Sequence, residues 1–546
     1  MPRHPRRTVT ILSLPTRARS RWRAVATSGL LAGAVVASLS TLGAQSSALA
    51  GSVTNPTGRT AAALPGAGDP NPAHHVCGNP ALLDGPSAPP PGAVVVQPGA
   101  SLPALVRQYP GGQTTFWLAP GTFTYGPGRY NQVIPFDGDT FIGAPGAVID
   151  GEGVNHYAFG QHATNVTIEY LTVTGFGRPG DNNNEGVLNH DSASGWVITH
   201  DTVIDNGGAG VMLGTNDVLS QDCLSHNGQY GFSAYSPQGV ANLKVTDNEI
   251  SGNDTYNWEA HDPGCGCAGG GKFWATNGAV VTGNYVHNNR DVGLWADTDN
   301  VGFNISDNVI SDNYAQGIIY EISYNALIAH NTLSRNALGV GPTNADFPSA
   351  AIYISESGSD HRIGGPYGHG LDISDNLLVN NWSGVVLWES ADRFCGSPDN
   401  TSTGSCTLVD RPAVSLATCN RAHLVNAHPK ARGIDYFDTC RWKTQNVSIT
   451  HNRFVLSPTA IGPNCTVSRS CGLQGLFSQY GTNPSWSPYR GETVEHDITT
   501  TQHNVFAKNT YSGPWHFMVH DQSQVVDFAT WQGSWHQDIA STDPGA

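Results

Sequence analysis

The stretch 307–321, "DNVISDNYAQGIIYE", carries the unit from which much of the chain is built: a short β-branched run between two asparagines, then a glycine and a second run. Related segments are "HDTVIDNG" at 200, "QDCLSHNG" at 221, "DNEISGND" at 247, "GNYVHNNR" at 283, "HNTLSRNA" at 330, "DNLLVNNW" at 375 and "HNRFVLSP" at 451. From Asn206 to Asn381 the second asparagines lie 21, 26, 36, 24, 23 and 45 residues apart. A unit recurring every ~20–25 residues predicts a solenoid.

The apolar residues of the repeat decide which solenoid this is. Leucine-rich repeats share the period and the asparagines, but here the apolar runs are short and mostly Val and Ile, with no segment of helical period between them. Such runs, separated by Gly, Asn and Asp, are typical of strands joined by turns. We expect the asparagines to satisfy the backbone at the bend of each coil. The sequence therefore predicts an all-β parallel β-helix with Asn248, Asn284, Asn308 and Asn331 in one column.

Two N-terminal segments, "FWLAPGTF" at 116–123 and "GAVIDGEG" at 146–153, read as opening coils. With the repeat, they make residues 93–395 resemble secreted right-handed parallel β-helix proteins of the pectate-lyase-like superfamily. The resemblance implies a right-handed, single-stranded β-helix, a fold that hosts hydrolases, lyases, epimerases and binding proteins. The amphipathic segment 101–109, with Ser101 as N-cap, is expected to form a short helix that caps the open end.

The chain divides into segments of different composition. Seven arginines before residue 24 precede the apolar run "GLLAGAVVASLSTLGA" and the small-residue site "ALA" at 48–50. This pattern is typical of a secretory signal peptide, with the export route left open. We expect the signal peptide at 1–50, a linker at 51–92, the β-helix at 93–395, disulfide-rich loops with a further coil at 396–480, and C-terminal coils with a cap at 481–546.

Charge and cysteine content limit the partners. Without the leader, 20 basic residues face 43 acidic ones, a net charge of −23. Such a chain should repel nucleic acid and anionic membranes, and no stretch of the mature part reaches the ~20 apolar residues of a membrane span. We expect an extracellular monomer.

The ten cysteines predict disulfides and no free thiols. Cys265-x-Cys267 fits a structural loop closure better than a zinc site, and 395–406, 419–440 and 465–471 are plausible local pairs.

A common frame for the glycine-initiated strands predicts which side chains point outward. We take each glycine as position zero, with Lys272 in its place in "KFWAT". Side chains alternate, so positions two and four point outward. Position two then holds Met212, Ser233, Trp274, Trp295, Ile319 and Tyr353, and position four holds His190, Gly214, Tyr235, Thr276, Asp297, Glu321, Ser355 and Trp388. The frame predicts an external groove with an aromatic stripe beside a carboxylate row. The aromatic rings would stack on sugars, or else pack beneath the 254–271 insertion.

Asp297 and Glu321 are the leading catalytic candidates. Like charges on adjacent strands destabilise each other, so their juxtaposition normally has a reason. In a retaining glycosidase the two carboxyl groups lie ~5–5.5 Å apart. At that separation their pKa values would differ, so that one group stays protonated as the acid and the other is an ionised carboxylate. A solvated acidic surface, or a pair stabilised by Lys272 or Arg290, is the alternative.

Several other residues are secondary candidates. Asp299, Glu356 and Glu389 lie toward strand ends and could be partners across a wider, inverting geometry, and Glu259 could reach over the groove. Lys272 could be a lyase base or a substrate clamp, or pair with a carboxylate. His190 with Asp191 would be a distal subsite. Substrate contacts are expected from Trp274, Trp295, Tyr353, His190, Glu356 and Glu389. No cofactor is required; calcium is conceivable in a carboxylate cluster, although no loop motif matches.

Three functions follow in order of preference. The first is an extracellular polysaccharide-cleaving glycoside hydrolase that uses Asp297 and Glu321. The second is a polysaccharide lyase or epimerase acting on uronates, with Lys272 as base; the shortage of cations between 186 and 392 places it second. The third is a noncatalytic glycan-binding protein.

Overall fold

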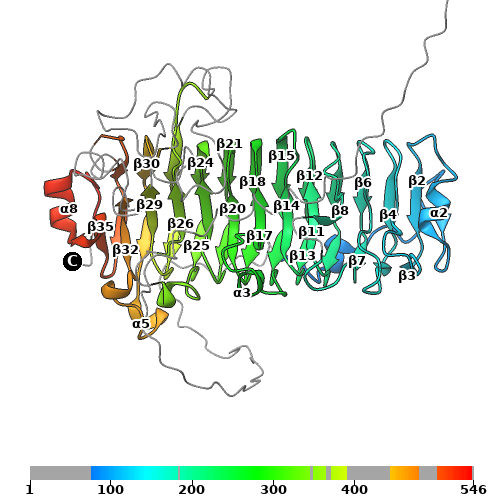
Figure 1. Cartoon of the computed structure of the whole chain (residues 1–546), viewed down its shortest axis with the longest axis horizontal. Coiled ribbons are helices and arrows are strands. Elements are labelled where there is room, and N and C mark those ends of the chain that lie inside the picture. Colours follow the sequence, from blue (N-terminus) through cyan, green and yellow to red (C-terminus); the bar gives the residue numbers. More distant parts are fainter. Residues whose placement is uncertain are drawn as a thin grey trace, which may run out of the picture.

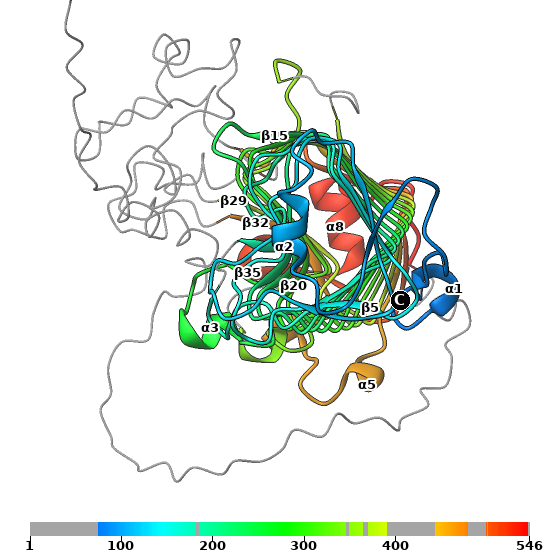
Figure 2. The ribbon, with the colours of Figure 1, turned by 90° about the vertical axis from the view of Figure 1, so that its right-hand side faces the viewer.

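The computed structural model describes residues 75–181, 185–344, 349–363, 370–389, 443–478, 498 and 501–543. Within them, the strands of three long parallel sheets follow one another in the same order along a rod-shaped molecule (Figure 1). Viewed along the rod, successive coils superimpose (Figure 2). This is a right-handed parallel β-helix, the hand that parallel crossovers nearly always take. The fold class predicted from the repeat is confirmed.

Most coils contribute one strand to each of the three sheets, but the first coils of the described chain have no strand in the smallest sheet. The 13-stranded sheet, sheet A, is formed by β1 (Val94–Val96), β2 (Thr115–Leu118), β4 (Thr140–Gly143), β6 (Thr167–Glu169), β9 (Val197–Thr199), β12 (Val218–Ser220), β15 (Val240–Thr246), β18 (Thr276–Thr282), β21 (Val301–Ser306), β24 (Tyr324–Ala329), β27 (Leu371–Ser374), β30 (Val447–Thr450) and β33 (Val505–Ala507). The 12-stranded sheet, sheet B, is formed by β3 (Gly121–Thr124), β5 (Ala147–Asp150), β7 (Thr172–Thr174), β10 (Thr202–Ile204), β13 (Cys223–Ser225), β16 (Glu249–Ser251), β19 (Tyr285–His287), β22 (Val309–Ser311), β25 (Thr332–Ser334), β28 (Leu377–Val379), β31 (Arg453–Val455) and β34 (Thr510–Ser512). The 10-stranded sheet, sheet C, is formed by β8 (Gly186–Leu188), β11 (Ala209–Leu213), β14 (Tyr230–Ala234), β17 (Gly269–Phe273), β20 (Val292–Ala296), β23 (Ile318–Glu321), β26 (Ile352–Ser355), β29 (Val385–Glu389), β32 (Leu473–Ser478) and β35 (His516–Val526).

Short helices occupy the ends and the loops. The described helices are α1 (Pro80–Leu83), α2 (Leu102–Val106), α3 (Trp258–His261), η3 (Gly341–Thr343), α5 (Pro458–Ile461), η5 (Val467–Arg469) and α8 (Phe528–Trp535). The predicted N-terminal cap is α2, which buries Leu102, Pro103 and Val106 at one end of the rod (Figure 1). Ser101 stands at its N-cap position but makes no side-chain capping bond. Helix α8 lies at the other end and buries Trp531.

Two columns of buried asparagines connect successive coils. Asn248, Asn284, Asn308 and Asn331 form one column, as predicted, and it continues through Asn376 and Asn452 to Asn509. The second column comprises Asn206, Asn227, Asn253, Asn289, Asn313, Asn336 and Asn381. Each side chain donates to a backbone carbonyl and, except for Asn509 and Asn381 at the ends of the columns, to the next asparagine, so polar backbone groups at these bends are satisfied inside the coil.

The residue before each ladder asparagine explains the "DN" and "HN" pairs of the repeat. Asp247, Asp307, His330 and Asp375 have φ between 55° and 58°, in the left-handed region. Asp, Asn and His tolerate that region better than other side chains apart from glycine. The dipeptide thus combines a left-handed turn residue with an inward amide.

The core fills the interior of the coils with stacked side chains from the inward strand positions. Phe232, Phe273, Phe303 and Tyr320 follow one another on successive coils, with ring centroids 5.2, 5.1 and 5.9 Å apart. Val, Ile and Leu fill most of the remaining interior. Burial of this continuous core is the main favourable term holding the rod together.

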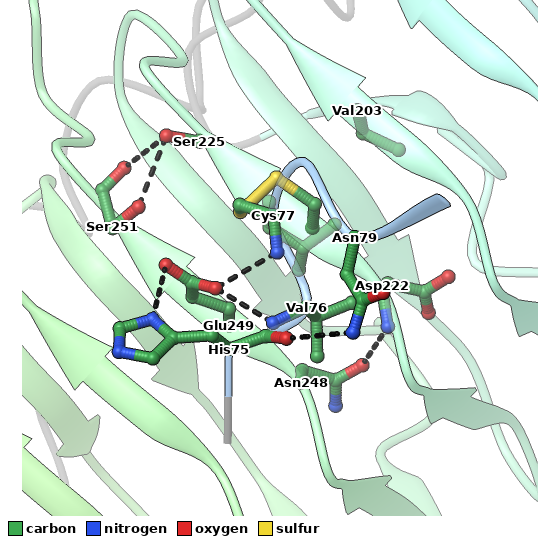
Figure 3. Close-up of a disulfide and its surroundings, with 12 residues drawn as sticks. His75, Val76, Cys77, Asn79, Val203, Asp222, Ser225, Asn248, Glu249 and Ser251 are labelled. Carbon is green, nitrogen blue, oxygen red and sulfur yellow. Dashed lines mark hydrogen bonds and ion pairs between the residues drawn. A yellow bond between two sulfur atoms is a disulfide. The ribbon is translucent and has the colours of Figure 1, made fainter. Parts of the chain in front are cut away.

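The segment that begins at His75 crosses the outer face of sheet B and is fixed to it. Cys77 forms a disulfide with Cys223 of β13. The backbone N–H groups of Val76 and Cys77 both donate to Glu249 Oε2 at 2.8 Å. Figure 3 shows these groups and the His75 ring directed at the Glu249 carboxylate. We call residues 75–84, including α1, the N-terminal strap.

In the described part of the chain, no helix is long and apolar enough to cross a membrane.

Candidate functional site

The register of sheet C fixes the neighbours of the predicted catalytic pair. Lys272 pairs with Trp295, Trp295 with Ile319, and Ala296 with Tyr320. Asp297 therefore follows β20 at the level of Glu321, the last residue of β23. The predicted adjacency of the two carboxylates on consecutive coils is confirmed by this register.

The frame predicted for β17 is wrong by two residues. Gly271 lies opposite Leu294 and Phe273 opposite Ala296, so Gly270 and not Lys272 takes the position of Gly293. Lys272 accordingly lies beside Trp295, and Trp274 lies at the level of Asp297.

Close approach of the neighbouring coils is the physical reason for this register. A Cβ on Gly270 would lie 2.4 Å from the Gly293 carbonyl oxygen, and one on Gly271 would lie 2.2 Å from the Phe232 ring. Both positions thus require glycine, which supports the observed alignment.

Asp297 is buried and forms an ion pair. Lys272 Nζ lies 2.9 Å from Asp297 Oδ2, and the two side chains are 12% and 3% exposed. The Thr298 backbone N–H and hydroxyl donate to Asp297 Oδ1 at 2.6 and 3.0 Å. The same ammonium lies 3.9 Å from the centroid of the Trp295 ring. The salt-bridge alternative for Lys272 is therefore what the structure shows, and its partner is the leading catalytic candidate.

Glu321 continues this polar network on the next coil. Trp295 Nε1 donates to Glu321 Oε2 at 3.2 Å, and the Ser355 hydroxyl lies 3.4 Å from Glu321 Oε1. The same hydroxyl also contacts Glu356 Oε2. Glu321 and Glu356 are 2% and 0% exposed. Ser355, which the sequence reasoning placed in the column without a role, thus connects two buried carboxyl groups.

The predicted exposed aromatic stripe is wrong. Trp295, Tyr353 and Trp388 are 2%, 5% and 2% exposed. They form a cluster on the outer face of sheet C with Ile319, Val386, Ala350 and further apolar residues, and Val340 packs against it. Trp274, at the level of Asp297 on the preceding coil, is half-buried, and so is Tyr235 on the coil before that. The predicted alternative, in which the rings pack beneath the 254–271 insertion, is right about their burial but wrong about the cover, because no residue of that insertion belongs to the cluster.

The insertion between β16 and β17 forms a compact loop beside Lys272. Cys265 and Cys267 form a disulfide, which confirms the predicted loop closure. Glu259 does not reach over the sheet, because its two oxygens accept the backbone N–H groups of Gly264 and Gly266, each at 2.9 Å. The Gly266 carbonyl oxygen accepts a bond from Lys272 Nζ at 2.5 Å. The loop is therefore in direct contact with the ion pair.

Two buried acids that the sequence reasoning did not single out lie near this loop. Burial raises the pKa of Asp291 well above its usual range, and the charges of Glu259 and Asp254 raise it further, although Lys272 opposes them. Burial also raises the pKa of Asp254 to about 7, although the hydrogen bond from the Trp258 backbone N–H and the positive charge of Arg290 both lower it. Neither acid shows a periodic signal in the sequence, since both lie outside the strands.

His190 does not belong to the carboxylate column. Leu188 pairs with Val211, so His190 falls at a different level from Gly214, and the strand has already ended at a left-handed Asn189. Its ring stacks on Tyr157 at 3.7 Å, and its nitrogens lie 2.9 Å from Gln132 Oε1 and 3.3 Å from Asp191 Oδ2. Burial lowers the pKa of His190 to about 4, although the negative charge of Asp191 acts to raise it.

The remaining acidic candidates have separate surroundings. Glu389 is buried and accepts bonds from the Thr444 backbone N–H at 2.8 Å and from Gln502 Nε2 at 2.5 Å, which connects β29 to the later coils. Asp299 is half-buried in a turn with φ 64°. Among the described residues, no group of three His, Cys, Asp or Glu side chains is arranged to hold a metal ion.

The comparisons with known proteins concern the fold. The family model "Right handed beta helix region" matches residues 185–365. No curated protein sequence matches the chain. Among solved structures, the A-module of a mannuronan C-5 epimerase of Azotobacter vinelandii is 12% identical, with 67% of this chain and 92% of that chain covered and a TM-score of 0.30.

Two further solved structures resemble the chain to a similar degree. A DFA-IIIase of Arthrobacter chlorophenolicus is 9% identical, with 68% and 96% of the chains covered and a TM-score of 0.34. An endo-xylogalacturonan hydrolase of Aspergillus tubingensis is 8% identical, with 82% and 93% covered and a TM-score of 0.32. The three parallel sheets and the family model over residues 185–365 confirm the predicted architecture, a right-handed parallel β-helix.

Proposed function

We propose that the protein is an extracellular glycoside hydrolase acting on a polysaccharide or oligosaccharide, with Asp297 and Glu321 as its catalytic carboxyl groups. The observation that carries the proposal is a buried network in which Lys272 contacts both Asp297 and the Trp295 ring, and Trp295 in turn donates to Glu321. Charged groups are rarely kept out of water without pairing or function, and such clusters concentrate at functional sites.

The different surroundings of the two carboxyls suggest their roles. Asp297 has an ammonium partner at 2.9 Å, which suits the carboxylate that attacks or stabilises the sugar. Glu321 is connected to a second carboxyl, that of Glu356, through Ser355. Two carboxyls that share one hydroxyl favour a proton on one of them, as a general acid requires. Consecutive coils lie ~4.8 Å apart, which suits the ~5–5.5 Å separation of a retaining pair.

Substrate would approach from the side of Trp274. This ring is half-buried, whereas the aromatic residues further along the sheet are covered. An indole at the level of Asp297 could stack against the apolar face of a pyranose. The predicted signal peptide and the three described disulfides support an oxidising, extracellular location.

The alternatives have less support from the geometry. A lyase with Lys272 as base needs a free amine, but Lys272 Nζ contacts Asp297, the Gly266 carbonyl and the Trp295 ring. A noncatalytic binder needs a row of exposed rings, whereas Trp295, Tyr353 and Trp388 are buried and Trp274 is half-buried.

The test replaces each carboxyl with its amide. Asp297→Asn and Glu321→Gln keep the side-chain shape, so the fold should be retained, while loss of acid–base function should lower kcat on the order of 10²–10⁴-fold. Turnover is measured as reducing ends released from a panel of neutral and acidic polysaccharides. Ultraviolet absorbance of the same products identifies a lyase, because only elimination produces an unsaturated sugar. Wild-type turnover in both variants would contradict the assignment.

A further inference from the structure

We propose that the disulfide loop Cys265–Cys267, together with Glu259, is a positioning element that holds the Lys272 ammonium against Asp297. Its effect on catalysis rests on the proposed function, whereas its effect on Lys272 does not. The loop residues would touch no substrate, so their role is positioning rather than catalytic.

Glu259 and the disulfide fix the loop from within. The two Glu259 oxygens accept from the N–H groups of Gly264 and Gly266, which lie on either side of Cys265. The disulfide between Cys265 and Cys267 joins the two residues that flank Gly266. Gly266 itself has φ 53°, a conformation that suits glycine. These constraints restrict the orientation of the peptide at Gly266.

The loop is also anchored to sheet C from outside. Gln229, next to β14, donates from Nε2 to the Cys267 carbonyl at 2.7 Å, and the Tyr230 hydroxyl donates to the Gly266 carbonyl at 3.3 Å. Burial raises the pKa of Tyr230 well above its usual range, and nearby carboxylates raise it further. The phenol therefore stays protonated and remains a donor to this carbonyl at neutral pH.

The Gly266 carbonyl in turn restricts the lysine. A lysine side chain carries ~2 kcal/mol of rotamer entropy and readily moves its ammonium. Here Nζ lies 2.5 Å from the Gly266 oxygen, 2.9 Å from Asp297 Oδ2 and 3.9 Å from the Trp295 ring centroid. The carbonyl is the only one of these three partners contributed by the insertion. Releasing the loop should leave the charge in place but loosen its position against the carboxylate.

The experiment compares a loop variant with a matched disulfide variant. Cys265→Ser/Cys267→Ser releases the loop, and Cys465→Ser/Cys471→Ser removes another local cross-link that makes no described contact with Lys272. Amine-selective labelling of the folded protein, mapped by mass spectrometry, reports on Lys272 separately, because the chain has only five lysines. Glu259→Gln keeps the disulfide but replaces one acceptor oxygen with a donor.

The expected result is faster labelling of Lys272 in the loop variant and in Glu259→Gln, with wild-type labelling in the matched variant. On a substrate that the wild type cleaves, kcat should fall by up to about 10²-fold, the cost of a small misplacement, while KM changes much less. Wild-type labelling of Lys272 in both loop variants would overturn the proposal. If Asp297→Asn leaves turnover intact while loop release still exposes Lys272, the catalytic assignment of Asp297 fails and the positioning role stands.

Discussion

Asn308 shows how a single side chain supports two neighbouring coils. Its Nδ2 donates to the Val281 carbonyl at 2.8 Å and to Asn331 Oδ1 at 2.9 Å. Its Oδ1 accepts from the backbone N–H of Asn284 at 3.0 Å and from Asn284 Nδ2 at 2.9 Å. All of these groups are buried, so no water can replace the amide if it is lost.

We predict that Asn308→Ala strongly destabilises the β-helix. Each buried donor or acceptor left unsatisfied costs ~1–3 kcal/mol, and this substitution affects several of them. Equilibrium urea unfolding measures the loss. Asn277→Ala is the control, because Asn277 is exposed in β18 and makes no described side-chain bond. Equal, small losses in the two variants would show that the ladder does not carry the stability assigned to it.

At the scale of the element, the repeat could be predicted from sequence because its causes are local. A left-handed turn residue, an inward amide and a β-branched run lie next to one another in the chain, as in Asp307–Asn308–Val309. The register of β17 could not be predicted, since it depends on Phe232 from the preceding coil, whose ring leaves no room for a side chain at Gly271. A lysine after three glycines gives no local sign of that contact.

The candidate site was predictable in part for the same reason. Asp297 and Glu321 occupy equivalent places in two regular repeats, so their adjacency follows from the period. The burial of Trp295 and Tyr353 depends on residues such as Val340 and Ala350, from an irregular insertion. The predicted pairing 465–471 is confirmed, whereas Cys395, Cys406, Cys419 and Cys440 lie outside the described residues.

The contacts between the N-terminal strap and Glu249 lead to a prediction about how the stability of the protein depends on pH. Burial alone would raise the pKa of Glu249, but bonds from His287 and from the N–H groups of Cys77 and Val76 outweigh it and lower that pKa. The His75 ring faces the same carboxylate, with Nδ1 3.8 Å from Oε1. A folded-state pKa below the unfolded value of ~4.3 stabilises the protein above that pH, and the stabilisation is lost as pH falls through the folded-state pKa.

We therefore expect Glu249→Gln to lower the unfolding temperature at pH 7, with the difference from wild type shrinking below about pH 4. Thermal unfolding measured across this range checks the expectation. Glu169→Gln provides a comparison with the opposite sign, because burial raises the pKa of Glu169. A Glu249 effect that is constant with pH would mean that the strap is held by the disulfide and not by the carboxylate.

At the scale of the molecule, the rod has few contacts between distant coils. Each strand pairs only with the strands of adjacent coils, so stability is close to a sum of neighbouring terms. The ends are closed by α2 and α8 (Figure 1). The Cys77–Cys223 disulfide is an exception, because it joins residues 146 apart and returns the strap to the middle of the rod. Cross-linking a loop of this length restricts the unfolded chain far more than a local disulfide does.

This difference leads to a prediction about where the rod opens. Cys77→Ser/Cys223→Ser should lose up to about 5 kcal/mol of stability. In hydrogen exchange, peptides from β2 to β13, inside the loop that the disulfide closes, should exchange faster. Peptides from β30 to β34 should keep wild-type rates, because their neighbours are unchanged. The Cys465→Ser/Cys471→Ser variant should affect only its own surroundings. Uniformly faster exchange along the whole rod in the first variant would show one cooperative unit, since a chain of independent neighbour contacts cannot transmit a local release to its far end.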